Sequence, residues 1–262
     1  MELVPSSRFS SEELADLFTR GYEGYVVPFA IDVAQLEFMV RTFDLDLDAS
    51  RVAVRDGEPV GLANLGVREG VGWIGGVGVV ASARRGGVGR ALMEAVHEQA
   101  RERALREVWL EVIEQNDAAF KLYEALGYRV VRDVVIGSID AELAAGSARE
   151  VAVEDALEIV RARRTAPEPW QRADETLRHY DDLRGLALDD GAAVWRAATG
   201  GRALLLQLAG SDDNALELLR TMRAHGVVTI FNVPEKDPAA HALAQLGGTV
   251  AMKQREMRLD PG

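Results

Sequence analysis

The residues best suited to chemistry lie in one stretch, residues 77–92, where an apolar run ends at Arg84 and Arg85 and passes through a glycine-rich turn into a helical pattern. Glycines let a backbone approach a phosphate without interference from a Cβ atom. The first N–H groups of a helix lack internal partners, and the helix dipole adds partial positive charge to that of the two arginines. The stretch is therefore predicted to bind an anion, and we expect a phosphorylated cofactor.

A second polar set follows about 30 residues later. Asn116 and Tyr123 share a helical pattern, and Glu111 stands on the apolar run before it. Two interpretations are open for each side chain. Tyr123 is either a catalytic phenol or a core aromatic, because its spacing from Ala119 and Leu126 suits a buried helix face. Glu111 is either a base or an ordinary polar residue at a strand edge.

The elements that must position these residues follow from periodicity, turns and caps. Asp56-Gly57 favours a tight hairpin, and Asp117 and Gly127 bound the helix that carries Tyr123. In the first half we expect strand 1–5, a helix from residue 10 or 11 to about 21, helix 32–43, strands within 51–67, strand 73–80, a helix after Gly87, strand 108–113, helix 117–127 and one or two closing strands over 128–139.

The second half repeats this order after a small, polar segment. The expected elements are helices 154–163 and 173–183, strands 192–197 and 202–208, helix 214–225, strand 227–233, helix 238–246 and strand 250–259. A shift of 120 positions aligns Asp117, Ala119, Leu126, Gly127 and Val130 with Asp237, Ala239, Leu246, Gly247 and Val250. We interpret this self-similarity as a duplication. The predicted domains are residues 1–140 and 150–262, joined by a linker over 141–149.

The pattern Arg84-x-x-Gly87-x-Gly89, followed by Asn116-x-x-Ala119-x-x-x-Tyr123, resembles the GNAT superfamily of acyl-CoA-dependent N-acetyltransferases. The resemblance covers about residues 1–139. It implies an α+β fold with two tandem GNAT-like domains, each a mixed, largely antiparallel twisted sheet flanked by helices. A dinucleotide fingerprint fits less well, because Leu92 stands at the third glycine position, and a P-loop is excluded because no Gly-Lys-Ser/Thr follows.

The resemblance also implies roles for individual residues. The backbone of Val77 and Val79 would pair with the pantetheine arm of acetyl-CoA, and Asn116 would hydrogen-bond that arm. Loop N–H groups from Arg84 or Arg85 through Arg90 would cradle the pyrophosphate, and Tyr123 would be the general acid for the leaving thiolate. The implied cofactor-binding set is Val77, Val79, Arg84, Arg85, Gly86, Gly87, Val88, Gly89, Arg90, Asn116 and Tyr123.

Amine acylation makes two further demands. The amine must lose a proton to attack a thioester, so Glu111, Glu114 or an ordered water is needed as base. The developing oxyanion needs a backbone donor, for which the Val79 N–H is the natural choice. With the roles that the resemblance implies for Tyr123 and Glu111, the predicted catalytic set is Tyr123, Glu111 and Val79, and residues 21–27 are expected to line the acceptor site.

The second half departs from this pattern at each functional position. Ser211-Asp212-Asp213 replaces Gly87-Val88-Gly89, and Leu208, Lys236 and Leu243 replace Arg84, Asn116 and Tyr123. Two carboxylates at a helix N-terminus stabilise the helix but repel a pyrophosphate. We therefore expect a degenerate second domain without cofactor, which shapes the acceptor site or stabilises the first domain.

Composition narrows the function further. The chain has no cysteine, and its four histidines are scattered, so no metal site is expected; His97 is predicted on the solvent side of its helix. A formal charge of −12 argues against nucleic acid. Asp44, Asp46 and Asp48 form either a solvated loop or a charge patch on the acceptor side. No apolar run is long enough to span a bilayer, so a cytoplasmic protein without membrane contact is expected.

The sequence thus predicts an N-acetyltransferase that moves the acetyl group of acetyl-CoA to a primary amine on a small molecule or peptide. The acidic composition favours a polyamine, an aminoglycoside-like compound or a protein amine over an anionic acceptor. The alternative function is a non-catalytic acyl-CoA-binding sensor or scaffold. Neither the acceptor nor the oligomeric state follows from the sequence.

Overall fold

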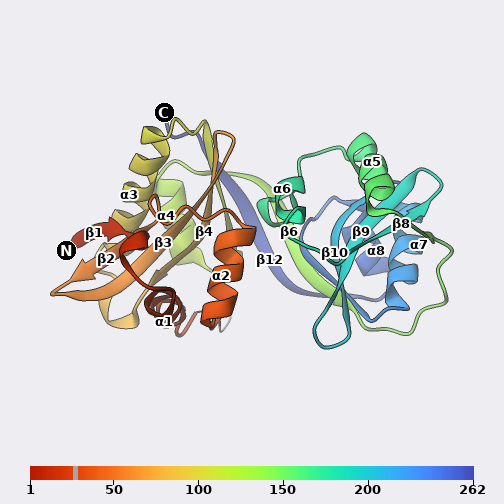
Figure 1. The fold of residues 1–262 in the computed structure, drawn as a ribbon, viewed down its shortest axis with the longest axis horizontal. Helices are drawn as coiled ribbons and strands as arrows, with labels where there is room; N and C mark the ends of the chain where they lie inside the picture. Colours follow the sequence, from red (N-terminus) through yellow and green to blue (C-terminus); the bar gives the residue numbers. More distant parts are fainter. Residues whose placement is uncertain (26–28) are drawn as a thin grey trace. The chain divides into compact units, whose positions relative to one another are not determined.

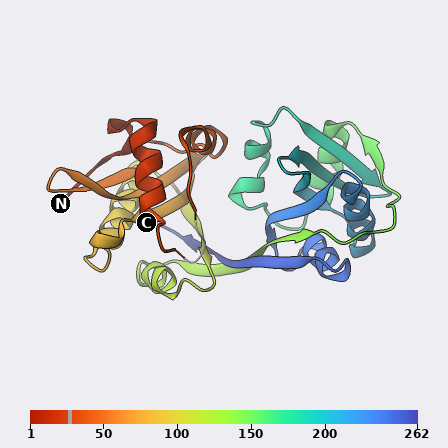
Figure 2. The same ribbon diagram turned by 90° about the horizontal axis from the view of Figure 1, so that it is seen from below.

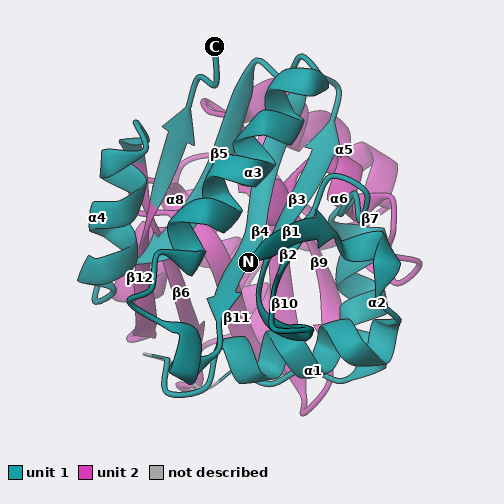
Figure 3. Ribbon diagram, turned by 90° about the vertical axis from the view of Figure 1, so that its left-hand side faces the viewer, with its two compact units in different colours: residues 1–131, 256–262 teal, residues 132–255 magenta. Residues whose placement is uncertain are grey.

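The computed structural model describes residues 1–25 and 29–262, which form two compact units. Unit 1 comprises Met1–Val131 and Glu256–Gly262, and unit 2 comprises Arg132–Arg255 (Figure 3). The chain leaves unit 1 within strand β6 (Arg129–Ile139) and returns within β12 (Thr249–Leu259). This division differs from the predicted boundary at residue 140, because residues 132–139 belong to unit 2 and the last seven residues to unit 1.

Unit 1 is a mixed sheet with the strand order β1-β2-β3-β4-β5-β12 (Figure 1). Neighbours from β1 to β4 are antiparallel, whereas β4 and β5 are parallel, which confirms the predicted α+β class. The predicted hairpin at Asp56-Gly57 joins β2 to β3. The elements are β1 (Glu2–Pro5), η1 (Ser6–Arg8), α1 (Ser11–Gly21), α2 (Val33–Thr42), β2 (Arg51–Arg55), β3 (Glu58–Arg68), β4 (Val71–Val79), η2 (Ala81–Ala83), α3 (Val88–Glu102), β5 (Glu107–Ile113) and α4 (Asp117–Ala125).

Helices cover both faces of this sheet. Successive side chains of a strand point to opposite faces. On β4, a Cβ atom built at Gly78 would lie 3.2 Å from Gly21 Cα at the end of α1, whereas one built at Gly89 in α3 would lie 3.9 Å from Val79 Cγ2. Gly78 and Val79 are adjacent, so α1 and α3 pack on opposite faces of β4. The C-terminal end of β4 is thereby enclosed between two helices.

The last strand of each unit comes from the other half of the sequence. Met257 and Leu259 of β12 lie in the core of unit 1, and Val135 and Ile139 of β6 lie in the core of unit 2. Strand β6 pairs antiparallel with β11 (Val227–Pro234) from Val228–Ile139 to Pro234–Val134. A strand over residues 128–139 was predicted to close the first half. The strand is present, but most of it completes unit 2.

Met257→Ala is expected to lower the free energy of unfolding by about 2–5 kcal/mol, because it leaves a cavity in a closed core. The Met257 side chain is fully buried in unit 1. Urea unfolding followed by fluorescence measures the loss. The matched control is Val250→Ala on the same strand, where the side chain is 43% exposed and a small change is expected. Equal effects of the two substitutions would contradict the role of β12 in the unit 1 core.

Unit 2 repeats the succession of unit 1, with the strand order β6-β11-β10-β9-β8-β7. Its helices α7 and α8 pack against each other (Figures 1 and 2). The predicted helix 173–183 is wrong beyond Leu177, where strand β8 follows after a turn. The elements are β7 (Arg149–Val151), α5 (Val153–Arg163), η3 (Trp170–Arg172), α6 (Asp174–Leu177), β8 (Leu183–Leu188), β9 (Gly191–Ala198), β10 (Arg202–Ala209), α7 (Asp212–Arg223), β11 and α8 (Pro238–Gln245).

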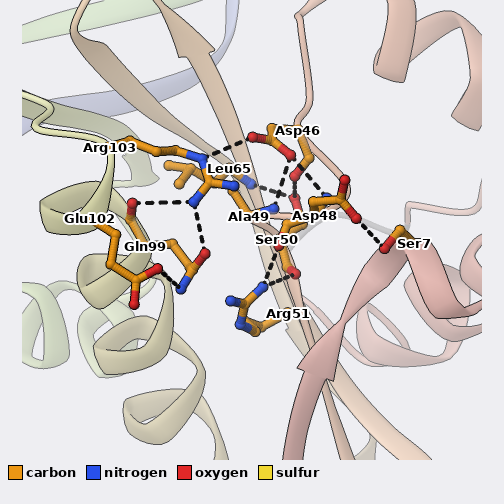
Figure 4. A network of polar contacts seen from close by, with 10 residues as sticks. All are labelled: Ser7, Asp46, Asp48, Ala49, Ser50, Arg51, Leu65, Gln99, Glu102 and Arg103. Carbon is orange, nitrogen blue, oxygen red and sulfur yellow. Dashed lines mark hydrogen bonds and ion pairs between the residues drawn. The ribbon is translucent and has the colours of Figure 1, made fainter.

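The acidic loop after α2 is bound into the fold of unit 1 (Figure 4). The Asp46 carboxylate accepts hydrogen bonds from the N–H groups of Asp48 and Ala49, both at 2.9 Å, and from Arg103 Nε at 3.0 Å. Asp48 accepts from the hydroxyl of Ser7. Asp46 is thus bonded to the residue that follows α3, and the exposed Asp48 to η1, while the choice between a solvated loop and a charge patch on the acceptor side stays a prediction. No helix of the described chain is long and apolar enough to cross a membrane.

Candidate active site

The two parallel strands of unit 1 separate part-way along their length. The parallel register of β4 and β5 joins residues 71–73 to residues 107–109. Beyond Trp73, β4 continues to Val79 and stays paired with β3 on its other side. β5 continues to Ile113. The backbone of β4 past Trp73 therefore has one edge turned away from β3, toward the opening between the strands.

Val77 and Val79 present their backbone groups to this open edge. The Val80 N–H donates to Val60 O on the β3 side, and antiparallel strands alternate the direction of their backbone groups from residue to residue. The protein itself uses part of the edge. The Val77 N–H donates to the hydroxyl of Tyr22, and Val79 O accepts from Arg84 Nε at 2.9 Å. The Val79 N–H, the predicted oxyanion donor, points to the open edge.

The Arg84 side chain holds the loop after β4 against the end of α1. Besides Val79 O, its guanidinium donates to Gly21 O at 3.1 Å and Glu23 O at 2.6 Å. Its hydrogen-bonding capacity is thus directed at three backbone carbonyls. Arg84 was predicted to add full charge to the anion site, whereas in the structure its donors hold the chain through these carbonyls.

The loop ends in a helix N-terminus with unused donors. Gly87 is the N-cap of α3 and adopts φ +79°, and no side chain caps this helix. The first intrahelical bond runs from the Ala91 N–H to Gly87 O, so the N–H groups of Val88, Gly89 and Arg90 have no partner within the helix. A Cβ atom built at Gly89 would meet nothing closer than 3.8 Å. These donors and this space fit the pyrophosphate of an acyl-CoA.

The corresponding helix of unit 2 is closed by its own side chains. Ser211 Oγ caps α7 by accepting from the Asn214 N–H at 3.1 Å, and Asn214 Oδ1 accepts from the Ser211 N–H at 3.0 Å. Asp212 and Asp213 occupy the first turn. The cap provides hydrogen-bond acceptors for N–H groups at the start of α7, and the two carboxylates repel an added anion.

Four tyrosines of unit 1 form one group, and one of them, Tyr22, reaches the open edge at Val77. Tyr123 on α4 is 8% exposed, and its ring centroid lies 5.9 Å from that of Tyr128. The rings of Tyr22 and Tyr25 lie 5.1 Å apart. Burial raises the pKa of Tyr123 well above its usual value, and Tyr25 raises it further. The Tyr123 phenol is therefore protonated at neutral pH, as a proton donor must be.

Asn116 is engaged on both sides of its amide. Its Oδ1 caps α4 by accepting from the Ala119 N–H at 3.2 Å, and its Nδ2 donates to the Tyr25 hydroxyl at 2.8 Å. Tyr22 and Tyr25 were given no role of their own from the sequence, although both lie within residues 21–27, the predicted acceptor loop. Tyr22 contacts β4 at Val77, and Tyr25 accepts a hydrogen bond from Asn116, so the turn is attached to both. Residues 26 and 27 of the predicted acceptor loop lie outside the described part of the chain.

Glu111 lies on β5 two residues beyond the last pair with β4. Its Oε2 accepts a hydrogen bond from the indole Nε1 of Trp73 at 2.9 Å, which fixes the carboxylate at the point where the strands separate. Glu114 is exposed in the turn before α4. The structure thus places one carboxylate of the two inside the region where β4 and β5 diverge.

His97 is buried, which overturns its predicted place on the solvent side of α3. It is 3% exposed, and its Nε2 lies 2.9 Å from the Tyr128 hydroxyl. The sequence contained the signal, because His97 follows Met93 by four residues and precedes Ala100 by three, on the buried stripe of the helix. Burial, and then Arg101, lowers the pKa of His97 to about 4.

This lowered pKa predicts a loss of stability in mild acid. The unfolded chain takes up a proton at His97 below pH 6.5, whereas the folded chain does so only near pH 4, so stability falls as pH falls through this window. We expect His97 to account for a loss of about 2 kcal/mol between pH 7 and pH 5. Urea unfolding of the wild type and of His97→Gln measures it. Parallel pH dependences of the two proteins would refute the assignment.

A family model described as "Acetyltransferase (GNAT) family" matches residues 12–128. Residues 12–128 are a GNAT acetyltransferase domain. The match spans α1 to α4, including the loop after β4, Glu111, Asn116 and Tyr123. The GNAT family transfers acyl groups from acyl-CoA, with amines of small molecules or proteins as acceptors. Among the described residues, no group of three or more His, Cys, Asp or Glu side chains is placed to hold a metal ion.

Solved structures extend the likeness over both units. A GCN5-related N-acetyltransferase from Sphaerobacter thermophilus is 19% identical with a TM-score of 0.72, over 99% of this chain and 95% of that chain. A tandem GNAT protein from the clavulanic acid biosynthesis pathway is 17% identical with a TM-score of 0.67, over 100% and 98%. At these identities the likeness concerns the fold, which is that of a tandem GNAT protein. A search of curated protein sequences finds no match.

Proposed function

We propose that unit 1 transfers the acetyl group of acetyl-CoA directly to a primary amine. One observation carries the proposal: the open edge of β4 leads through η2 and the glycine turn to an uncapped helix N-terminus, with a buried, protonated phenol nearby. An elongated molecule with a diphosphate at one end and a thioester at the other matches this order of groups. The acyl-CoA supplies the activated acyl group.

The proposal assigns roles to backbone groups and to one side chain of unit 1. The N–H groups of Val88, Gly89 and Arg90 bind the diphosphate, and the open edge at Val77 and Val79 pairs with the extended arm. The Val79 N–H donates to the thioester oxygen as negative charge develops there. Tyr123 protonates the leaving sulfur.

Glu111 is proposed to take the proton of the amine. Its carboxylate is fixed by Trp73 where the strands separate, whereas Glu114 is exposed in a turn. A carboxylate held in place within hydrogen-bond reach of the proton that it takes up is suited to act as general base. Glu111→Gln would then lower kcat, and Glu114→Gln would leave it unchanged. The reverse order would assign the base to Glu114, and an unchanged rate in both would assign it to water.

Unit 2 is proposed to be non-catalytic. Its equivalent helix end carries a complete cap at Ser211 and two carboxylates, so the chain offers one acyl-CoA site. Titration calorimetry with acetyl-CoA should give one site per chain. Two sites would overturn this part of the proposal.

The direct test is acetyl transfer to a panel of amines that includes polyamines, aminoglycosides and peptide N-termini, followed by release of free thiol. We expect turnover with at least one class of amine. A chain that does not bind acetyl-CoA would overturn the whole proposal. A chain that binds it but acetylates no amine would support the second candidate, a sensor or scaffold, which the degenerate second unit favours.

A further inference from the structure

A guanidinium from outside the loop lies against the proposed phosphate site. Arg55 is the last residue of β2, 31 positions before Gly86. A Cβ atom built at Gly86 would lie 3.6 Å from Arg55 Nη2 and 4.0 Å from its Nη1. Both terminal nitrogens of the side chain therefore lie over the glycine turn. β2 ends at the same end of the sheet as β4, since both run antiparallel to β3, and this topology brings Arg55 to the loop.

Arg55 is an arginine from another strand whose side chain is available to a ligand at the loop. Across residues 1–25 and 29–262 it makes no hydrogen bond and no ion pair. Arg84 is committed to three backbone carbonyls, and Arg90 lies 3.5 Å from the Glu94 carboxylate. An arginine presents two terminal nitrogens in a fixed plane, which suits the paired oxygens of a phosphate.

We propose that Arg55 binds the diphosphate of the acyl-CoA and completes the site begun by the N-terminus of α3. The inference rests on the proposed function. The helix end contributes partial charges, and Arg55 contributes the full charge that Arg84 does not direct there. Gly86 lies between Arg55 and the N-terminus of α3. The diphosphate held by the loop is therefore the part of the ligand that both can reach. This arrangement favours a thioester of coenzyme A over one carried on a phosphopantetheine arm with a single phosphate.

The test uses Arg55→Met in the full chain, with Arg55→Lys as a second variant. Dissociation constants are measured by calorimetry for coenzyme A, for dephospho-coenzyme A, which keeps the diphosphate but lacks the 3′-phosphate, and for pantetheine. We expect Arg55→Met to weaken the first two ligands equally, by about tenfold or more, and to leave pantetheine unchanged. Arg55→Lys should recover part of the loss, because it keeps the charge but not the fork.

Arg106→Met is the matched control. Arg106 lies beside Gly70 at the opposite end of β4, so its loss should not change the affinity for coenzyme A. Unchanged affinity in Arg55→Met would overturn the proposal. A loss confined to coenzyme A would also overturn it, since the contact would then be to the 3′-phosphate. If the wild-type chain bound no coenzyme A, the proposed function itself would fail, which is a separate outcome. Thermal unfolding of each variant confirms that it is folded.

Discussion

Tyr123→Phe is expected to lower kcat for acetyl transfer by about 10²–10⁴-fold, which is the contribution typical of a positioned general acid. The substitution removes one oxygen from a side chain that is 8% exposed, so the ring keeps its packing against Tyr128. The affinity for acetyl-CoA should not change, because the binding groups belong to β4 and to the N-terminus of α3. Thiol release gives kcat, and calorimetry gives the affinity on the same preparation.

Two tyrosine variants separate catalysis from packing. Tyr128→Phe breaks the hydrogen bond to His97 but leaves the Tyr123 hydroxyl in place, so it should lower stability more than kcat. Tyr180→Phe in unit 2 should leave kcat unchanged. If Tyr123→Phe turned over as fast as the wild type, Tyr123 would be a core aromatic, and the interpretation based on its helical spacing alone would be correct.

Gly89→Asp is expected to weaken acetyl-CoA binding by about 100-fold or more, because a carboxylate within a few ångströms of a diphosphate costs several kcal/mol in a partly desolvated site. The position tolerates a side chain, since Gly89 has ordinary helical geometry and the nearest atom to its Cβ is 3.8 Å away. An aspartate in the first turn also stabilises a helix. Binding should therefore fall while the melting temperature holds or rises.

Gly89→Asn is the control for this substitution, because asparagine has the shape of aspartate without its charge. It should weaken binding far less than Gly89→Asp. The aspartate variant also reproduces unit 2, where Asp213 is the second residue of α7 as Gly89 is of α3. Equal losses for the two variants would show that bulk, and not charge, excludes the ligand. Calorimetry and thermal unfolding of the three proteins decide between these results.

Local rules predicted most of the elements and the helix end of the site. The capping box at Ser10 and the hairpin at Asp56-Gly57 involve residues at most a few positions apart, and the cap of α4 is Asn116, one residue before the predicted Asp117. The phosphate site at Gly87–Gly89 depends on a turn and the helix that follows it. Each of these features depends on residues that are close together in the chain, so a single sequence is enough to predict it.

Long-range pairing determined the rest. The periodicity of residues 128–139 predicts a strand but not its partner, and most of β6 pairs with β11 because each unit takes its last strand from the other half of the chain. Long-range contacts also determine which charged side chain lies at the loop. Whether Arg84 or Arg55 faces the loop depends on where the end of α1 and the end of β2 come to lie.

The sequence by itself therefore determined the GNAT resemblance, the order of elements, the glycine turn before α3 and the loss of that turn in the second half. Only the tertiary structure decided that His97 is buried against Tyr128, that Arg84 binds carbonyls, that Arg55 reaches Gly86, and that Met257 closes the core of unit 1. The physical reason is that capping and periodicity act between neighbours in the chain, whereas burial, ion pairing and strand partnership are set by segments that meet only in the folded protein.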